Sequence, residues 1–212
     1  MESYKTIRID NDYEEVIKKS RFICSLFRIE NEQEGKTILA ELKKQHYKAN
    51  HSCSAMIIGD KAEIKRSSDD GEPSGTAGIP ILSVLEKQEL TNILAVVTRY
   101  FGGIKLGTGG LIRAYSSVTS AAIKQADIVE VKEQSCLEIT LNYSQYQTFP
   151  IFLEKFCLIE QETEFLYYIK TRVYFDPDLE EMLSKDLIQF FNGKVTFENR
   201  DSKIIEVPFS DR

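Results

Sequence analysis

The sequence predicts an α+β protein of two domains, residues 1–133 and 134–212. In the second domain the expected elements follow the order strand, helix, strand, strand, helix, strand, which is the ferredoxin-like plan. Charge divides the chain at the same place. Residues 1–133 hold nineteen basic and nineteen acidic side chains, a net charge of zero, whereas residues 134–212 hold eight and fourteen, a net charge of −6. Pattern and charge therefore change together near Glu133.

The first domain opens with strand-like alternation at residues 4–9 and 20–29, and Asn11-Asp12 is expected to turn the chain between them. A helix should follow, because Asn31 and Glu34 have the spacing of a cap and its third-residue partner. The remaining elements are expected to be strands at 48–58 and 62–66, a helix at 76–85, a strand at 92–98 buried on both faces, a helix from Gly109 to Ala126 and a strand at 127–132.

In the second domain, residues 135–141 alternate as a strand, and Pro150 interrupts the helix expected next. We favour a start after Thr148, with the proline in the first turn; a start at Ser144 with a bend is the alternative. Residues 160–175 supply one long strand or two. Asp176-Pro177 then begins a helix that Asn192-Gly193 ends, before a last strand at 195–207. Its apolar stripe is expected to be Leu179, Met182, Leu183, Leu187, Phe190 and Phe191.

The composition is that of an ordinary globular protein, with 42% apolar and 28% charged residues. The sequence shows neither a long apolar run nor an N-terminus like a signal peptide, so we expect a cytoplasmic protein without membrane segments. The cysteines occur singly, without a Cys-x-x-Cys pair, so we expect no disulfide and no zinc site, but reduced thiols in the core. They are Cys24, Cys53, Cys136 and Cys157. We also expect no other metal and no cofactor.

Most of the chain's eleven glycines lie between Asp69 and Arg113. A helix is predicted to begin there, with the apolar stripe Leu111, Ile112, Tyr115, Val118, Thr119 and Ala122. The first amides of a helix lack internal partners and carry the positive end of its dipole, and glycines allow a ligand to approach them. The alternative is that these glycines serve only turns and close packing. The predicted anion-binding face comprises Arg99, Gly102, Gly103, Lys105, Gly107, Thr108, Gly109, Gly110 and Arg113.

A second candidate is the acidic loop that contains Asp69, Asp70 and Glu72. Its carboxylates suit a hard cation or a general base, but Asp-Gly and Glu-Pro are also ordinary turn chemistry, which we favour. On the strand at 48–58, His51 and Cys53 share one face. That is the geometry from which a Cys-His nucleophile starts, although a buried cysteine beside a hydrogen-bonded histidine is the interpretation we favour. The candidate functional loop comprises His51, Asp69, Asp70, Glu72, Ser74 and Thr76.

Four segments together form a specific signature: KSRFI at 19–23, HSCSAMIIGD at 51–60, DDGEPSGTAGIPIL at 69–82 and VVTRYFGGIKLGTGGLIRAY at 96–115. With them the sequence resembles the YigZ/IMPACT family, in particular its bacterial two-domain members. The resemblance implies a first domain like domain IV of elongation factor G and a ribosomal protein domain, with a left-handed βαβ crossover. It implies a second domain like domain V of the same factor. Eukaryotic relatives restrain a stress-activated kinase that phosphorylates a translation initiation factor.

What the resemblance implies for this chain is a non-catalytic cytoplasmic binding protein that acts in translation or its regulation. From the basic, glycine-rich face we predict that it binds RNA or a phosphate-bearing small molecule; a ribosome-associated factor is a further candidate partner. One alternative is a phosphate- or nucleotide-handling enzyme that uses Asp69, Asp70 and Glu72. A second alternative is a regulator that docks on other proteins through its acidic C-terminal domain.

Overall fold

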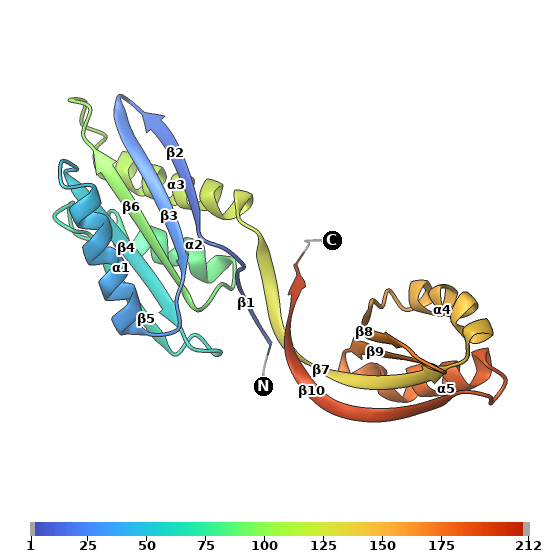
Figure 1. Ribbon diagram of the computed structural model, residues 1–212. Coiled ribbons are helices and arrows are strands. Elements are labelled where there is room, and N and C mark those ends of the chain that lie inside the picture. The colour runs from blue at the N-terminus through green and yellow to red at the C-terminus, as the bar shows by residue number, and fades with distance from the viewer. Residues whose placement is uncertain (1–2, 210–212) are drawn as a thin grey trace. The chain divides into compact units, whose positions relative to one another are not determined.

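The computed structural model describes residues 3–209, which form two compact α/β units (Figure 1). The N-terminal unit comprises residues 3–131 and 206–209, and the C-terminal unit comprises residues 132–205. These residues thus have the mixed α/β architecture that the sequence predicts, with two five-stranded sheets.

One of these sheets belongs to the N-terminal unit, and its neighbouring strands all run antiparallel. In sheet order the strands are β2 (Asn11–Ile17), β3 (Ser20–Arg28), β6 (Ile93–Tyr100), β4 (His51–Ile58) and β5 (Ile64–Ser68). The predicted turn at Asn11-Asp12 is wrong, because both residues begin the edge strand β2. The turn lies instead at Lys18-Lys19, whose φ angles of 46° and 67° suit a two-residue hairpin.

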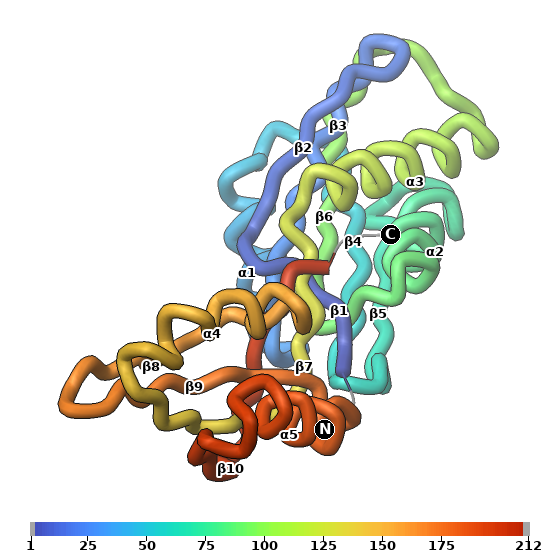
Figure 2. The backbone as a smooth tube through the Cα atoms, turned by 90° about the vertical axis from the view of Figure 1, so that its right-hand side faces the viewer, coloured from blue at the N-terminus to red at the C-terminus, as the bar shows by residue number. Residues whose placement is uncertain are grey.

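Helices cover both faces of this sheet (Figure 2). The helix α1 (Glu32–Gln45) begins at Asn31, whose side chain accepts a hydrogen bond from Glu34 N, as predicted. It packs on one face, and α2 (Gly78–Lys87) and α3 (Thr108–Gln125) pack together on the other. In α3 the predicted stripe is buried except at Ile112, which is 39% exposed. Ile112 lies about 100° around the helix from Leu111, so both cannot face the sheet.

The strand β1 (Tyr4–Ile7) pairs with the first residues of β7 (Ile128–Leu141). Two strands, at 127–132 and 135–141, were expected here, but β7 is a single strand of 14 residues. Glu133-Gln134 between them contains no turn-forming residue, so the chain continues extended.

The C-terminal unit has the element order that the sequence predicts. After β7 come α4 (Tyr143–Lys155), β8 (Glu160–Phe165), β9 (Ile169–Phe175), a short 3₁₀ helix (Pro177–Leu179), α5 (Glu180–Phe190) and β10 (Thr196–Pro208). The strand β7 pairs with β9 and β10, and β9 pairs with β8. Asn192 and Gly193, with φ angles of 51° and 75°, follow α5 and end it as predicted.

Several details of this unit differ from expectation. The helix α4 starts at Tyr143 rather than after Thr148, because Asn142 and Gln145 form a capping box that fixes its start, and Pro150 lies inside it. Asp176 occupies the N-cap position of the 3₁₀ helix that begins at Pro177, as predicted, but its carboxylate forms no capping hydrogen bond and instead accepts from Lys132 and Gln134. Two side chains expected in the core are exposed, Met182 and Cys157.

Among residues 3–209, every helix is too short or too polar to cross a membrane.

Candidate functional site

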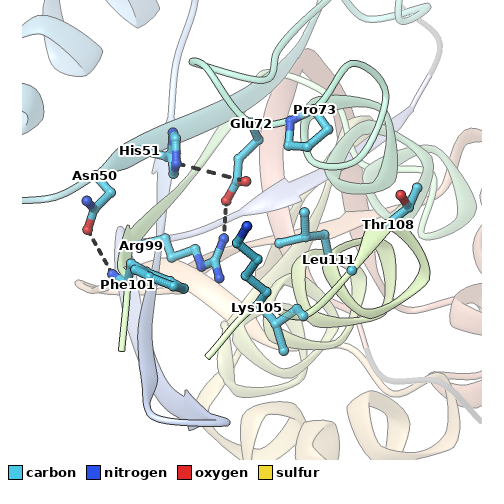
Figure 3. Close-up of a pocket in the computed structure, with 11 residues that line it drawn as sticks. Asn50, His51, Glu72, Pro73, Arg99, Phe101, Lys105, Thr108 and Leu111 are labelled. Atoms are coloured by element: carbon cyan, nitrogen blue, oxygen red, sulfur yellow. Dashed lines mark hydrogen bonds and ion pairs between the residues drawn. The ribbon is translucent and has the colours of Figure 1, made fainter. Parts of the chain in front are cut away.

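The N-terminal unit contains a cavity of about 460 Å³ where β4 begins, β6 ends and α3 begins (Figure 3). It combines polar and charged side chains with an apolar wall. The lining residues are Asn50, His51, Glu72, Pro73, Arg99, Phe101, Lys105, Leu106, Gly107, Thr108 and Leu111.

Strand register places the two central residues of this cavity side by side. His51 on β4 lies directly opposite Arg99 on β6, so their side chains share one face of the sheet. Cys53 and Val97, two residues further along each strand, lie in the core that α2 and α3 cover. His51 and Arg99 therefore continue the helix-covered face out to the end of the sheet, beside the first turn of α3.

Arg99 forms a buried ion pair with Glu72. The guanidinium Nη1 lies 2.6 Å from Oε1 of Glu72, and the two side chains are 5% and 4% exposed. Tyr115 donates a second hydrogen bond to the same oxygen, at 2.8 Å. Arg99 was predicted to bind an anion, and here a carboxylate already compensates its charge. Its Nε is buried without a hydrogen-bond partner among the described residues.

The other two carboxylates of the acidic loop also have protein partners. Asp69 accepts hydrogen bonds from the backbone N–H groups of Gly75, Ala77 and Gly78, at 2.8 to 3.0 Å, and so holds the start of α2. Burial alone would raise the pKa of Asp69, but these backbone donors outweigh it and lower the pKa. Asp70 pairs with Lys43 at 2.6 Å.

Asp70 also fixes the strand that carries His51. Its Oδ2 accepts from the backbone N–H of Ser52 at 2.6 Å, and its own carbonyl lies 2.9 Å from Nδ1 of His51. A carbonyl can only accept, so Nδ1 of His51 carries the proton and donates. In the neutral ring Nε2 is then an acceptor. This atom lies 3.9 Å from Oε2 of Glu72, which is too far for a hydrogen bond.

Cys53 lies two residues after His51 on β4 and belongs to the core. Its thiol donates to the carbonyl of Asp69 at 2.9 Å, and burial raises its pKa to about 12. Burial likewise raises the pKa of Tyr115, whose hydroxyl lies 3.4 Å from the sulfur. A thiol with such a raised pKa is protonated and a poor nucleophile at neutral pH. The geometry favours a buried cysteine beside a hydrogen-bonded histidine.

The glycines of the predicted anion face have different physical roles. At Gly102 a Cβ would lie 1.9 Å from the carbonyl oxygen of Lys19, so only glycine permits this contact. Gly103 and Gly107 have φ angles of 83° and 71°, which glycine adopts without strain. A Cβ at Gly109 would meet only the tip of Arg113, at 3.7 Å, so this first turn of α3 is open. Among residues 3–209, no side chain caps that turn.

The cavity brings together members of both predicted sets. His51 and Glu72 come from the acidic-loop candidates, and Arg99, Lys105, Gly107 and Thr108 come from the anion face. Figure 3 shows Lys105 pointing into the cavity that Glu72 and Arg99 line. The predicted residues that do not line it are Asp69, Asp70, Ser74, Thr76, Gly102, Gly103, Gly109, Gly110 and Arg113.

Five lining residues were not among the sequence candidates. Asn50 is one of them. Its Oδ1 accepts from the backbone N–H of Phe101, at 2.8 Å, and so joins the start of β4 to the end of β6, a contact that no sequence pattern indicated. Phe101 lies within the Arg-Tyr-Phe-Gly-Gly run, and an aromatic residue flanked by cations and glycines was the available signal. The remaining three are Pro73, Leu106 and Leu111.

The chain is similar to known proteins along most of its length. The family model described as the Impact N-terminal domain matches residues 18–123, which include every residue that lines the cavity. The IMPACT family member YvyE of Bacillus subtilis (strain 168) is 38% identical over 206 residues, which cover 97% of this chain and 95% of that protein. The IMPACT family member YigZ of Escherichia coli (strain K12) is 39% identical over 135 residues, covering 63% and 65%. A crystal structure of a hypothetical protein matches with a TM-score of 0.60 and 30% identity, covering 93% of this chain and 97% of that one.

Proposed function

Because the chain belongs to the IMPACT family, we propose that it is a non-catalytic cytoplasmic binding protein that acts in translation or its regulation. Its ligand carries a phosphate, and RNA is the first candidate. The phosphate binds at the cavity mouth, between Lys105 and the first turn of α3.

One observation carries this proposal: cationic side chains without a carboxylate partner lie beside free backbone N–H groups at the cavity. Lys105 lines the cavity together with Gly107 and Thr108. Within the described part of the chain, no carboxylate pairs with Lys105 or with Arg113. Arg113 is exposed beside Gly109, on the uncapped first turn of α3. Helix N-termini with adjacent cations bind phosphate groups through their free N–H groups.

The proposal extends to the folds. The N-terminal unit is like domain IV of elongation factor G, and the C-terminal unit is like its ferredoxin-like domain V. In support, β3 and β4 both run antiparallel to β6, hence parallel to each other, and α1 connects them. This is the βαβ crossover expected to be left-handed. The C-terminal strand order β10-β7-β9-β8 supports the ferredoxin-like plan.

Filter binding of single-stranded RNA across a salt series tests the binding face. The double variant Lys105→Ala/Arg113→Ala should bind more weakly. The slope of log K against log[salt] should also become shallower, by about one phosphate contact for each cation removed. Lys124→Ala is the matched control, because Lys124 is an exposed lysine at the other end of α3. Equal affinity and slope for wild type and the double variant would remove the proposed face.

A second candidate, a phosphate- or nucleotide-handling enzyme, has one observation in its favour. His51 and Glu72 present acceptors to the cavity that could take up a proton. Asp69 and Asp70, the other residues of this candidate, are held in backbone and lysine contacts. Isothermal titration with ATP and Mg²⁺ separates the two functions, because turnover of ATP would favour the enzyme.

A further inference from the structure

We propose that the cavity recognises the cis-diol of a ribose next to a phosphate, and so distinguishes a ribonucleotide from a deoxyribonucleotide. This inference rests on the proposed function, because it takes the phosphate to bind beside Lys105 at the start of α3. It assigns a role to His51 and Glu72, which form the polar floor of the same cavity.

The first supporting observation concerns Glu72. Its side chain is 4% exposed, and its Oε1 accepts hydrogen bonds from Arg99 and Tyr115. Its Oε2 accepts none from the described residues, although the carboxylate lines the cavity. Oε2 is accessible from the cavity, so its lone pairs take a donor from water, and a ligand that displaces this water must replace that donor. A ligand that fits this cavity therefore brings a hydrogen-bond donor to Glu72.

His51 presents a second acceptor close by. The carbonyl of Asp70 holds the proton on Nδ1, so Nε2 of the neutral ring has a free lone pair. Nε2 lies 3.9 Å from Oε2 of Glu72, so two acceptors face the cavity at neighbouring positions without bonding to each other. Two donors on adjacent atoms match this pair. The 2′ and 3′ hydroxyls of ribose are such donors, and a deoxyribose lacks one of them.

The rest of the cavity fits the remainder of one nucleotide. Lys105 and the N–H groups at the start of α3 are placed for the phosphate. Phe101 is 44% exposed and lines the cavity, so it offers an aromatic side chain against which a base can stack. A volume of about 460 Å³ is within the range of small-ligand pockets and suits a single nucleotide. A diol beside a phosphate occurs at the 3′ end of RNA and in a free ribonucleotide.

Fluorescence anisotropy with three 5′-labelled oligonucleotides of one sequence tests the inference. They are an all-ribose strand, the same strand with a 2′-deoxy 3′-terminal nucleotide, and an all-deoxy strand. Wild type should lose about tenfold or more in affinity from the single terminal 2′-deoxy change, as expected for a hydrogen bond to a charged group. Isothermal titration with adenosine 5′-monophosphate and its 2′-deoxy analogue then distinguishes a free ribonucleotide from an RNA end.

Variants assign the discrimination to residues. His51→Ala and Glu72→Gln should each reduce the ribose-to-deoxyribose ratio towards one, whereas Lys105→Ala should weaken both strands equally and leave the ratio unchanged. Thermal unfolding checks that Glu72→Gln still folds. His51→Ala is the second variant because it leaves both members of the buried ion pair in place. Wild type that binds all strands equally would overturn the inference and leave the proposed function standing. A ratio that persists in both variants would also overturn it, and a protein that binds no strand would overturn the proposed function itself.

Discussion

Glu72, in the loop before α2, and Arg99, at the end of β6, neutralise each other at the floor of the cavity. Their charged atoms lie 2.6 Å apart, and both side chains are almost fully buried. The Arg99 guanidinium also lies against the rings of Phe22 and Phe101, with distances of 5.3 and 5.5 Å to their centroids. This pair therefore joins the acidic loop to the central sheet.

Removing one member of the pair should be costly. Glu72→Ala should lower the free energy of unfolding by about 3 to 5 kcal/mol, because it leaves Arg99 buried without a counter-charge. The double variant Glu72→Leu/Arg99→Met should lose less than Glu72→Ala alone, since it removes both charges. Urea unfolding of the three proteins measures this. A double variant less stable than Glu72→Ala would contradict it.

The two glycines Gly102 and Gly109 should respond differently to the same change. Gly102→Ala places a methyl group against the backbone carbonyl of Lys19 and should cost more than about 2 kcal/mol in the free energy of unfolding. Gly109→Ala lies in the first turn of α3, where the methyl group meets only the tip of Arg113, and should be neutral or stabilise by up to about 1 kcal/mol. Thermal or urea unfolding compares the pair, and similar losses for both would show that the contact with Lys19 is unimportant.

The cysteines should differ in reactivity in the native protein. Cys157 is exposed, whereas burial raises the pKa of both Cys24 and Cys53 to about 12. Burial also raises the pKa of Cys136. A thiol reagent added to native protein should therefore modify Cys157 rapidly, and the other three only on unfolding. Cys157→Ser is the control, since it should remove the rapid phase. Rapid labelling that survives in Cys157→Ser would contradict the prediction.

Glu138 should make the stability of the C-terminal unit depend on acid pH. Hydrogen bonds from Arg200 and Arg172 lower its pKa from 4.5 to about 2. Because the folded-state pKa is lowered, its contribution is complete above the ordinary pKa of a glutamate and is lost as the pH falls through about 2. The difference in free energy of unfolding between wild type and Glu138→Gln should therefore shrink as the pH is lowered from 4.5 to about 2.

Thermal unfolding across that pH range measures the difference. Glu164→Gln is the matched control, since Glu164 is an exposed glutamate on β8 with no ion pair within residues 3–209. Its difference from wild type should stay constant with pH. A difference for Glu138→Gln that is equally constant would sink the prediction.

Local patterns predicted the central strands and most of the helix boundaries, because each depends on neighbouring residues, whereas the start of α4 was wrong. Asn31 caps α1 and the buried run of β6 is a central strand, both as the sequence indicated. The edge strand β2 was missed because Asn11 and Asp12 are typical turn residues, and their extended conformation depends on pairing with β3.

The site was predictable in its parts but not in its arrangement. The sequence identified the acidic loop and the glycine-rich segment separately. That Glu72 would neutralise Arg99, 27 residues away, depends on the loop folding back over the end of β6. Likewise, His51 lies opposite Arg99 only because of the register between β4 and β6. Register and loop path are tertiary properties that periodicity does not encode.

The close approach of Gly102 to the turn at Lys19 has a thermodynamic consequence for any occupant of the cavity. Gly102 also donates its N–H to Ser20 Oγ at 3.2 Å, and Asn50 holds the N–H of the preceding residue. The backbone beside the cavity entrance is thus anchored to the first residue of β3 and to the residue before β4 before anything binds. A ligand therefore meets a preorganised segment at the cavity entrance, and little of its binding free energy is spent on ordering that segment.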